Sequence, residues 1–424
     1  MTGGPRVFVS AGEVSGDRIL GEILEPLRRR HPGLELRGLG GHAAAACGLA
    51  PLFPIERTAI SGIWDVARNV FFAVRMYAAA VREIRRFRPH LVLLVDYPGL
   101  NLRLARVARN LGVPVYFVAP PQAWAYRNPV RKSARARKAL RGCAVQVLFP
   151  FEAEAYGATI GTVATVGIAA TAGSVDDAIR LTSGHFFSGA GLEASASPAH
   201  RENRATVADE TGKSLLCLCP GSRLPVLRRN LPLWLELLDK AGRLPVYGRE
   251  MAILVPGHLV EAASLILTSY CGGEPRPAFR IRTDKAAVFA EARHAIAFPG
   301  TITLELALAR VPTLVMAILD PLTLAVGRRV LGSGRIALPN LILGQPLFPE
   351  WVGPAPGPEL GLFRQLEQDR DRMNAWEPRL QSLTTRMGPG NGVEVAVREC
   401  SEMLASRDAA LKVQAVGEPA PKMG

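Results

Sequence analysis

One short segment combines a strand, a glycine turn and a helix start in the order that a phosphate site requires. The apolar strand before Pro299 leads into Gly300 and Thr301, and helical spacing follows. Such a helix start offers unpaired backbone N–H groups and the positive end of its dipole to an anion. Glu305 stands about one turn beyond Thr301, where its carboxylate can accept both hydroxyls of a ribose. The pattern predicts a sugar-nucleotide site. The alternative is a capped helix whose glutamate meets solvent.

A second turn of small residues lies near the front of the chain. The β-rich run 7–9 is followed by 10–17 (SAGEVSGD), and helical spacing begins there. Gly12, Ser15 and Gly16 allow backbone amides to approach a ligand closely. The segment is neither a GxGxxG fingerprint nor a P-loop, which argues against a dinucleotide or ATP site.

Polar residues also close other strand-like runs. Asp96 follows 91–95 (LVLLV), where it can act as a general base toward a sugar hydroxyl or cap the next helix. Arg223 follows a Gly-Ser turn after 215–219, where it can neutralise a diphosphate or form an interdomain ion pair. Asn340 precedes a turn and bonds either a phosphate or sugar, or the turn itself.

The composition indicates a folded α/β protein of two domains. A chain of 424 residues exceeds one ordinary core, and 48% hydrophobic residues with 41 glycines and 33 prolines argue against disorder. The cysteines show no CxxC or zinc spacing, which predicts reduced thiols in a cytosolic protein and no metal site. Charged residues come too early for a secretory signal, and no apolar run reaches the roughly 18 residues of a membrane span.

The net charge of +14 predicts attraction to an anionic partner, whether nucleic acid, lipid surface or phosphorylated substrate. Part of this charge lies in the basic run 127–141. The run lacks the interleaved aromatic residues that favour nucleic-acid binding, so a solvated helix face is the alternative and no nucleic-acid partner is predicted.

The order of apolar runs predicts two doubly wound, Rossmann-like parallel sheets. We expect strands at 6–10, 35–39, 91–96, 114–118, 144–148, 215–219, 252–255, 295–298 and 313–316. The expected divisions are a first domain (1–167), a linker with irregular structure (168–212), a second domain (213–385), a terminal helix (386–410) and a disordered tail (411–424). Ligands of such sheets bind beyond the carboxyl ends of the strands, where the polar residues above are found.

Several motifs, in order, resemble one family, the lipid-A-disaccharide synthases. The resemblance covers roughly residues 6–165 and 212–352. It rests on 10–17 (SAGEVSGD), 60–65 (ISGIWD), 95–101 (VDYPGLN), 118–127 (VAPPQAWAYR), 148–152 (LFPFE), 220–223 (PGSR), Gly300 and Thr301 with Glu305, 338–341 (LPNL), and Pro349 with Glu350.

The resemblance implies an inverting, metal-independent GT-B glycosyltransferase without a cofactor. It would join UDP-2,3-diacylglucosamine to 2,3-diacylglucosamine 1-phosphate and release UDP. Asp96 would be the base, and Glu13 would assist at the acceptor or reaction side. The other positions implied to contact substrate or nucleotide are Gly12, Ser15, Gly16, Gln122, Ser222, Arg223, Gly300, Thr301, Glu305, Asn340 and Gln345.

The resemblance also implies a place at the inner membrane, on its cytoplasmic side. The segment 63–87 mixes apolar residues with arginines and is expected to form an interfacial surface toward anionic lipid; the alternative is a core helix. Whether the protein forms a homodimer is a question that the sequence leaves open.

The sequence departs from the family pattern at four places. Ile168 follows Gly167 where a Gly-His pair is expected at the hinge, and 224–228 (LPVLR) lacks an acidic residue. Ala317 and Ile318 replace an aromatic-basic pair, and Gly353 replaces a glutamine. Two alternatives therefore remain: another GT-B sugar-nucleotide enzyme, either a glycosyltransferase or an epimerase, or a non-catalytic basic binding protein.

Overall fold

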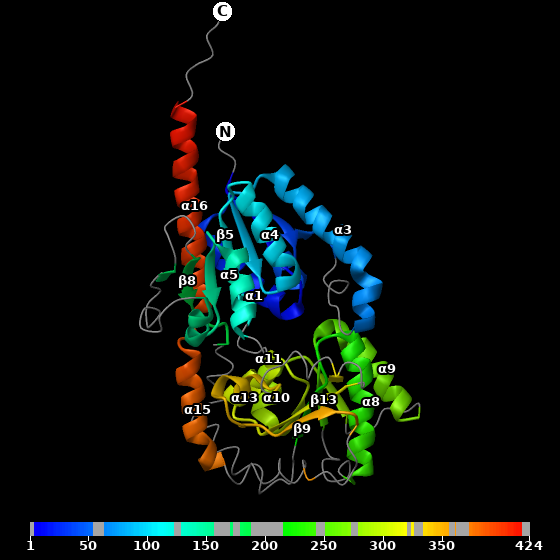
Figure 1. The fold of residues 1–424 in the computed structure, drawn as a ribbon. Helices are drawn as coiled ribbons and strands as arrows, with labels where there is room; N and C mark the ends of the chain where they lie inside the picture. The colour runs from blue at the N-terminus through cyan, green and yellow to red at the C-terminus, as the bar shows by residue number, and fades with distance from the viewer. Residues whose placement is uncertain are drawn as a thin grey trace, which may run out of the picture.

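Two sheets, each covered by helices on both faces, form the two halves of the molecule (Figure 1). The computed structural model describes residues 4–53, 63–122, 129–156, 170–172, 179–187, 215–242, 251–272, 279–319, 324–325, 334–355, 361 and 373–417. The central strands are apolar throughout because both of their faces are buried, as parallel sheets require. The predicted fold class, with two Rossmann-like halves, is confirmed.

The first half contains an eight-stranded sheet in the order β3-β2-β1-β4-β5-β6-β8-β7. Its strands are parallel except β7, which is antiparallel to β8. In chain order they are β1 (Arg6–Ala11), β2 (Glu35–Leu39), β3 (Ala50–Pro51), β4 (Leu91–Val95), β5 (Val115–Val118), β6 (Ala144–Val147), β7 (Ala170–Ala172) and β8 (Ile179–Ser183).

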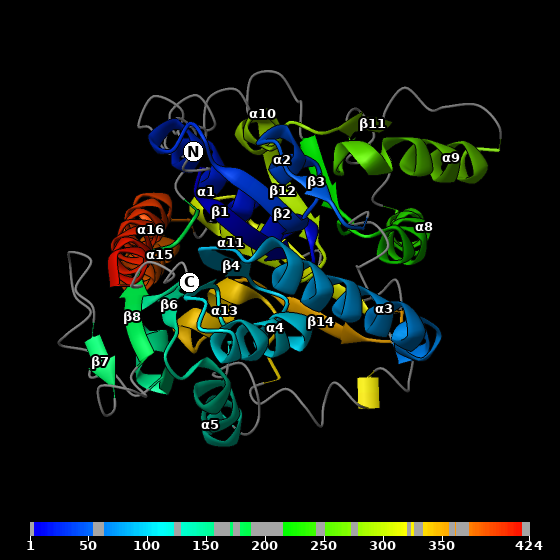
Figure 2. The same ribbon diagram turned by 90° about the horizontal axis from the view of Figure 1, so that it is seen from above.

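Two groups of helices sandwich this sheet (Figure 2). One face carries α1 (Val14–Arg30), α2 (His42–Ala46) and α16 (Gly392–Gly417). The other carries α3 (Ile63–Phe87), α4 (Pro98–Asn110), α5 (Pro129–Leu140) and the short helix η3 (Pro150–Tyr156). Each group buries its apolar stripe against one side of the sheet, which gives this half two cores.

The second half contains a six-stranded parallel sheet in the order β11-β10-β9-β12-β13-β14. Its strands are β9 (Leu215–Cys219), β10 (Met251–Leu254), β11 (Phe279–Arg282), β12 (Ala292–Ala297), β13 (Thr313–Ile318) and β14 (Glu350–Gly353). Its helices are α8 (Leu224–Lys240), η5 (Gly257–Leu259), α9 (Val260–Tyr270), α10 (Lys285–Glu291), α11 (Thr301–Leu308), α13 (Leu338–Leu343) and α15 (Met373–Met387).

The structure corrects the predicted linker. Residues 179–183 are not irregular but form β8, which pairs in parallel with β6, and 170–172 form β7 at the edge. The prediction failed because this part of the chain offers a weak apolar signal. Leu181 alone among the apolar side chains of β8 is described as fully buried, and β7 is an edge strand, which needs few apolar residues. The edge strands β11 and β14 of the second sheet escaped prediction for the same reason.

The C-terminal helix is also longer than predicted. It continues to Gly417, so the predicted disordered tail is wrong for 411–417, and residues 418–424 lie outside the described part. The chain crosses from the second half to the first between α15 and α16, as Figure 1 shows at its left side. Trp376 of α15 packs against Phe348 of the second half, whereas α16 contacts α1, β4, β5 and β8 of the first.

Buried polar groups fix this crossing to the first sheet. The amide nitrogen of Gln146 donates to the carbonyl oxygens of Gly184 (2.9 Å) and Gly392 (3.0 Å), while its oxygen accepts the Tyr116 hydroxyl (2.7 Å). The His185 ring bonds the Gly388 carbonyl through Nε2 (3.0 Å) and accepts the Phe187 N–H at Nδ1 (3.3 Å). This pattern requires a neutral ring, and burial lowers the pKa of His185 accordingly.

Gly184 and His185 also supply the Gly-His pair that the sequence lacked at Gly167. They follow β8 and contact the crossing segment, which is the hinge position expected for that pair. The chain therefore carries a Gly-His pair at the crossing, although not directly at Gly167 as the family pattern predicts.

Gly392 generates a prediction about stability. A Cβ at this position would lie 2.7 Å from the carbonyl oxygen of His185, which is backbone and cannot move aside cheaply. Gly392→Ala should therefore lower the free energy of unfolding by about 1–3 kcal/mol. Gly99→Ala, where a Cβ meets nothing within 4 Å, is the control and should be neutral. Urea denaturation of both variants is the measurement; equal stabilities would show that the crossing tolerates a wider separation.

Candidate functional site

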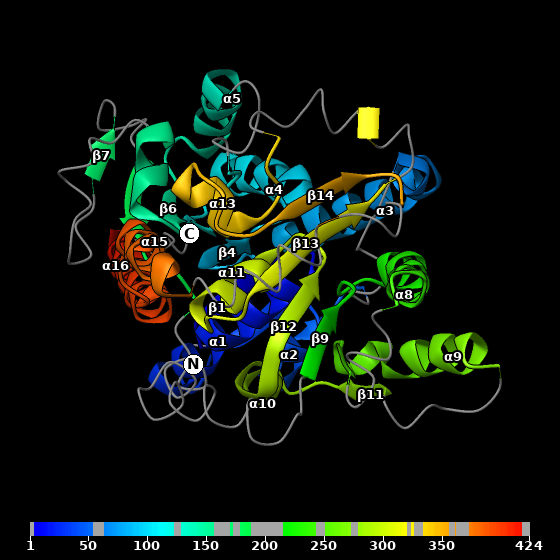
Figure 3. The same cartoon turned by 90° about the horizontal axis from the view of Figure 1, so that it is seen from below.

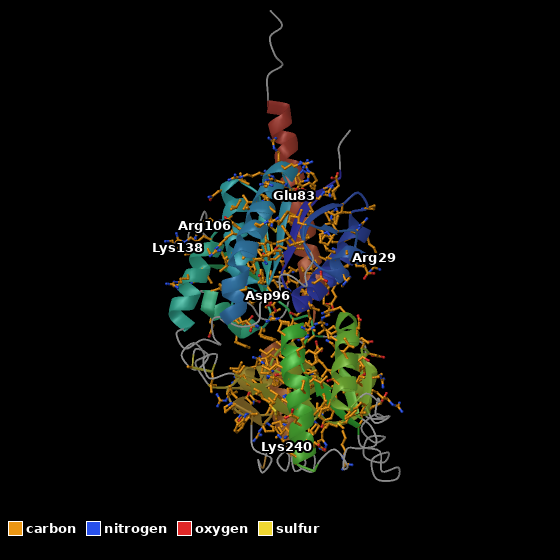
Figure 4. All side chains as sticks on the ribbon, turned by 90° about the vertical axis from the view of Figure 1, so that its right-hand side faces the viewer. Arg29, Glu83, Asp96, Arg106, Lys138 and Lys240 are labelled. Atoms are coloured by element: carbon orange, nitrogen blue, oxygen red, sulfur yellow. The ribbon has the colours of Figure 1, made fainter. Side chains whose placement is uncertain are left out.

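The polar residues predicted from the sequence follow neighbouring strands at the junction of the two halves. Glu13 comes after β1 and Asp96 after β4, and these strands are paired through Ala11 and Val95. In the other half, Arg223 comes after β9 and Thr301 after β12, which are also paired. Figure 4 shows Asp96 at the boundary between the halves.

A strained loop holds Asp96. Asp96 and Tyr97 both have left-handed backbone conformations, with φ of 50° and 49°. Such conformations cost about 1 kcal/mol or more each and persist only where surrounding contacts impose them. The Asn101 amide supplies these contacts, since its nitrogen donates to the carbonyls of Val95 (3.2 Å) and Asp96 (2.7 Å) while its oxygen accepts the Ser10 hydroxyl (2.7 Å).

The surroundings of Asp96 favour a proton on its carboxyl group. Burial raises the pKa of Asp96 to about 6, and the nearby negative charge of Glu13 adds to the rise. A backbone hydrogen bond at Tyr97 and the positive charge of Arg223 act in the opposite direction. A carboxylate whose pKa lies this close to neutral pH can take up a proton during a reaction. The alternative role as a helix cap is not observed, because Tyr97 is the N-cap of α4 and no side chain caps it.

An ion pair joins the two halves beside Asp96. The Arg223 guanidinium lies 2.6 Å from the Glu13 carboxylate, and both side chains are about one third exposed. This is the interdomain ion pair that the sequence offered as the alternative role of Arg223. Because the partners are partly solvated, either group remains within reach of a substrate that enters between the halves.

The small residues at the end of β1 have a packing role. A Cβ on Gly12 would lie 2.3 Å from the Tyr97 ring, and one on Gly16 would lie 3.8 Å from the Asp96 Cβ. Gly12 is therefore required by close packing against Tyr97. Ser15 is half-buried on the first turn of α1. Asp17 accepts the backbone N–H groups of Gly41, Ala43 and Ala44 at 2.6, 2.8 and 3.2 Å, which ties α1 to α2.

Glu305 lies in the second half of the molecule, at the sugar-nucleotide site predicted from the sequence. Its side chain is only 5% exposed, and one carboxylate oxygen accepts a hydrogen bond from Lys285 at 2.8 Å. The other oxygen is buried without a hydrogen bond and has a long contact of 3.5 Å with Arg18 of the first half. A buried acceptor left without a donor is costly and suits a ligand that brings hydroxyl groups.

Arg18 and Lys285 were missed by the sequence reasoning. Lys285 precedes Glu305 by 20 residues, and Arg18 belongs to the other half of the molecule. No spacing rule connects either residue to Glu305. Arg18, Lys285 and Glu305 come together only because α1, α10 and α11 lie close to one another in the fold.

The prediction that Asn340 contacts nucleotide is not supported by the geometry. Its amide oxygen accepts the backbone N–H groups of Leu347 (2.7 Å) and Phe348 (2.9 Å), and its nitrogen donates to the Phe348 carbonyl (2.8 Å). Glu350 takes a further hydrogen bond from Asn340 and accepts the N–H groups before α13. Asn340 therefore positions this loop, which was the alternative reading of the sequence.

The remaining predicted positions lie at loops and helix starts. Ser222 is exposed in the turn before α8, and Thr301 is half-buried at the first position of α11, just after Gly300. Gln345 is exposed in the turn after α13, and Gln122 is half-buried beyond β5, at the end of a described segment. Ser222 lies just before α8 and Thr301 begins α11, and the first N–H groups of both helices are available to an anion.

Comparisons with known proteins agree with these observations. A family model described as Lipid-A-disaccharide synthetase matches residues 7–167 and 191–377. Lipid-A-disaccharide synthase from Nitrosococcus oceani is 28% identical over 402 residues, which cover 91% of this chain and 93% of that protein. The protein of the same name from Acidobacterium capsulatum is 30% identical over 366 residues, covering 83% and 84%.

Solved structures share the fold at much lower identity. A putative UDP-N-acetylglucosamine 2-epimerase from Listeria monocytogenes is 12% identical with a TM-score of 0.54, and each chain is fully covered. The UDP-GlcNAc 2-epimerase from Neisseria meningitidis is 9% identical with a TM-score of 0.52, covering 94% of this chain and 99% of that one. At these identities the likeness supports the arrangement of two facing sheets alone.

Proposed function

Because this chain belongs to the lipid-A-disaccharide synthase family and is therefore a hexosyltransferase, we propose that it joins two acylated glucosamines between its halves. The donor is UDP-2,3-diacylglucosamine and the acceptor is 2,3-diacylglucosamine 1-phosphate. Family membership favours this reaction over the epimerase and the non-catalytic binding protein. The observation that carries the proposed chemistry is the Asp96 carboxylate with its raised pKa, beside the Glu13–Arg223 pair.

In the proposed step, Asp96 takes the proton from the 6-hydroxyl of the acceptor. The hydroxyl oxygen then forms a bond to C1 of the donor sugar, and the bond from C1 to the UDP oxygen breaks with inversion. Arg223 stabilises the negative charge that develops on the diphosphate. Glu13 keeps the pKa of Asp96 high enough for proton uptake. These groups balance the charges of the step, and no metal or cofactor is assigned to it.

The nucleotide end of the donor is assigned to α11. The N–H groups at Gly300 and Thr301 face the phosphates, and the unbonded oxygen of Glu305 accepts a ribose hydroxyl. Arg18, at 3.5 Å, can move aside because its side chain is 39% exposed.

The first prediction for this mechanism concerns pH. Since Asp96 must be ionised to accept a proton, kcat/KM should rise with pH through about 6 and then level off. Glu13→Gln removes a like charge and frees Arg223, so the midpoint of this rise should move to lower pH. Glu25→Gln, on α1 and paired with Arg29, is the control and should leave the midpoint unchanged. An unmoved midpoint in Glu13→Gln would refute the coupling.

Asp96→Asn separates catalysis from structure in the same experiment. Turnover should fall about 10²-fold or more, because the amide cannot take the proton. The raised pKa means that ionised Asp96 costs stability, a cost absent below its unfolded pKa and complete once pH exceeds about 6. The variant should therefore be more stable than wild type at pH 8, by up to about 3 kcal/mol. Loss of both turnover and stability would make Asp96 structural.

A second prediction concerns UDP. Glu305→Gln keeps the side-chain volume but removes the charge, so the Kd for UDP should rise about tenfold or more. Glu291→Gln is the control, since Glu291 of the same half pairs with Arg282 at the far end of α10. Calorimetric titration with UDP is the measurement, and an unchanged Kd in Glu305→Gln would remove Glu305 from the donor site.

Membrane contact through α3 forms part of the proposal. None of the helices in the described ranges is long and apolar enough to cross a bilayer, so attachment would be peripheral. Met76, Ala80 and Ile84 of α3 face the core, as the core-helix alternative required. Phe72 packs edge to face on Phe53, at 5.5 Å between ring centres. The Phe71 side chain lies outside the described part.

The outward face of α3 presents Val74, which is 59% exposed, next to the exposed Arg75. Val74→Asp should therefore reduce sedimentation with vesicles that contain anionic lipid, because a carboxylate opposes both insertion and charge attraction. Leu111→Asp is the control: Leu111 is 44% exposed and belongs to the end of α4, not to α3. Equal binding of both variants would exclude α3 as the lipid-binding surface.

A further inference from the structure

A groove of about 660 Å³ lies between α8 and α9 on the outer face of the second half. Its lining is mainly apolar, and its volume falls in the range of small-molecule sites. The apolar residues that matter here are Leu224, Pro232, Leu259, Ala262, Leu265 and Ile266. None of them takes part in the catalytic step.

Strand order connects this groove to the reaction site. Glu305 follows β12, Arg223 follows β9, and His258 and Leu259 follow β10. These three strands are neighbours in the parallel sheet, so their carboxyl ends lie in a row with steps of about 4.8 Å. A donor with its ribose at Glu305 and its diphosphate at Arg223 therefore directs its sugar toward the groove.

The groove continues away from the cleft along α8. Leu224 directly follows Arg223, and the lining residues Leu224, Arg228, Pro232 and Glu236 recur every four residues along one face of the helix. Twelve residues at 1.5 Å each give a length of about 18 Å. One leaflet of a bilayer, half of its roughly 30 Å hydrocarbon core, measures about 15 Å. The groove is thus about as long as one acyl chain.

The character of its surface fits the same occupant. Leu265 is 66% exposed, the highest value among the exposed large hydrophobic residues that the structure describes. Arg228, near the start of α8, and His258, after β10, also line the groove and offer polar partners to a glycolipid. α8 and α9 lie on the same flank of the molecule as one end of α3, the helix assigned to lipid contact (Figure 3).

We propose that the α8–α9 groove binds one acyl chain of the UDP-linked donor. This inference rests on the proposed function, because it presumes an acylated sugar nucleotide with its UDP at Arg223 and Glu305. The groove would make the second half specific for acylated donors, since UDP alone gains nothing from it. Burial of each methylene favours binding, so affinity should increase with chain length.

Binding measurements with donors of two chain lengths test the proposal. Wild type should bind UDP-diacylglucosamine with long chains at least tenfold more tightly than an analogue with short chains. Ala262→Phe fills the groove and should raise the Kd for the long-chain donor about tenfold. The Kd values for UDP and for the short-chain donor should stay unchanged. Ser264→Phe places the same ring on an exposed position of α9 outside the groove and is the matched control.

Leu265→Asp provides a second variant. Because Leu265 is exposed, misfolding would not explain a loss of long-chain donor affinity. The variant should show the same selective loss of long-chain donor affinity. An equal Kd for both chain lengths in wild type, or a long-chain donor Kd in Ala262→Phe and Leu265→Asp that matches wild type, overturns the proposal. The proposal is also overturned if the variants lose only vesicle binding, because the groove would then contact bilayer lipid. Loss of self-association alone overturns it as well, because the groove would then contact a second copy of the chain.

Failure of the groove and failure of the proposed reaction give different results. If wild type makes no disaccharide but discriminates chain length through Ala262 and Leu265, the reaction is wrong and the groove assignment holds. If wild type makes disaccharide while the groove variants bind the long-chain donor normally, the groove assignment is wrong and the reaction holds.

Discussion

The attachment of the C-terminal segment to the first sheet is the constraint on which the rest of the structure depends. α15 packs with the second half and α16 with the first, so the short connection between them limits how far the halves can separate. Gln146 and His185 hold this connection by buried hydrogen bonds. Because these bonds are shielded from water, losing one leaves an unsatisfied polar group, which makes the attachment hard to release.

The carboxylate proposed as the base is maintained at the expense of stability. Asp96 combines a left-handed backbone, burial and a like-charged neighbour, and each of these is unfavourable by itself. The Asn101 amide compensates locally by satisfying the carbonyls of the strained loop. Such concentrations of strain and shifted pKa are typical of functional sites, where the fold opposes what the local sequence would choose.

Charged residues at the junction serve both the fold and the proposed reaction. Glu13 pairs with Arg223 and also raises the pKa of Asp96, while Glu305 connects to Arg18 and Lys285. In both cases the groups proposed to hold the donor already have protein partners from the same or the facing half. Glu13 and Arg223 are both partly exposed, which keeps their pairing weak. Glu305 is buried, but its partners Arg18 and Lys285 are partly exposed and can yield to a substrate.

The sequence by itself determined the parallel sheets and the positions of Glu13, Asp96, Arg223 and Glu305, because apolar runs and the turns that end them are local signals. It did not determine that Asn340 serves its loop or that β8 completes the first sheet, since partners distant in the chain decide these roles. Likewise, Arg18 reaches Glu305 only because the two halves face each other, and Lys285 only because the second half folds α10 close to α11. Local pattern specifies where a strand ends; only packing specifies what that end meets.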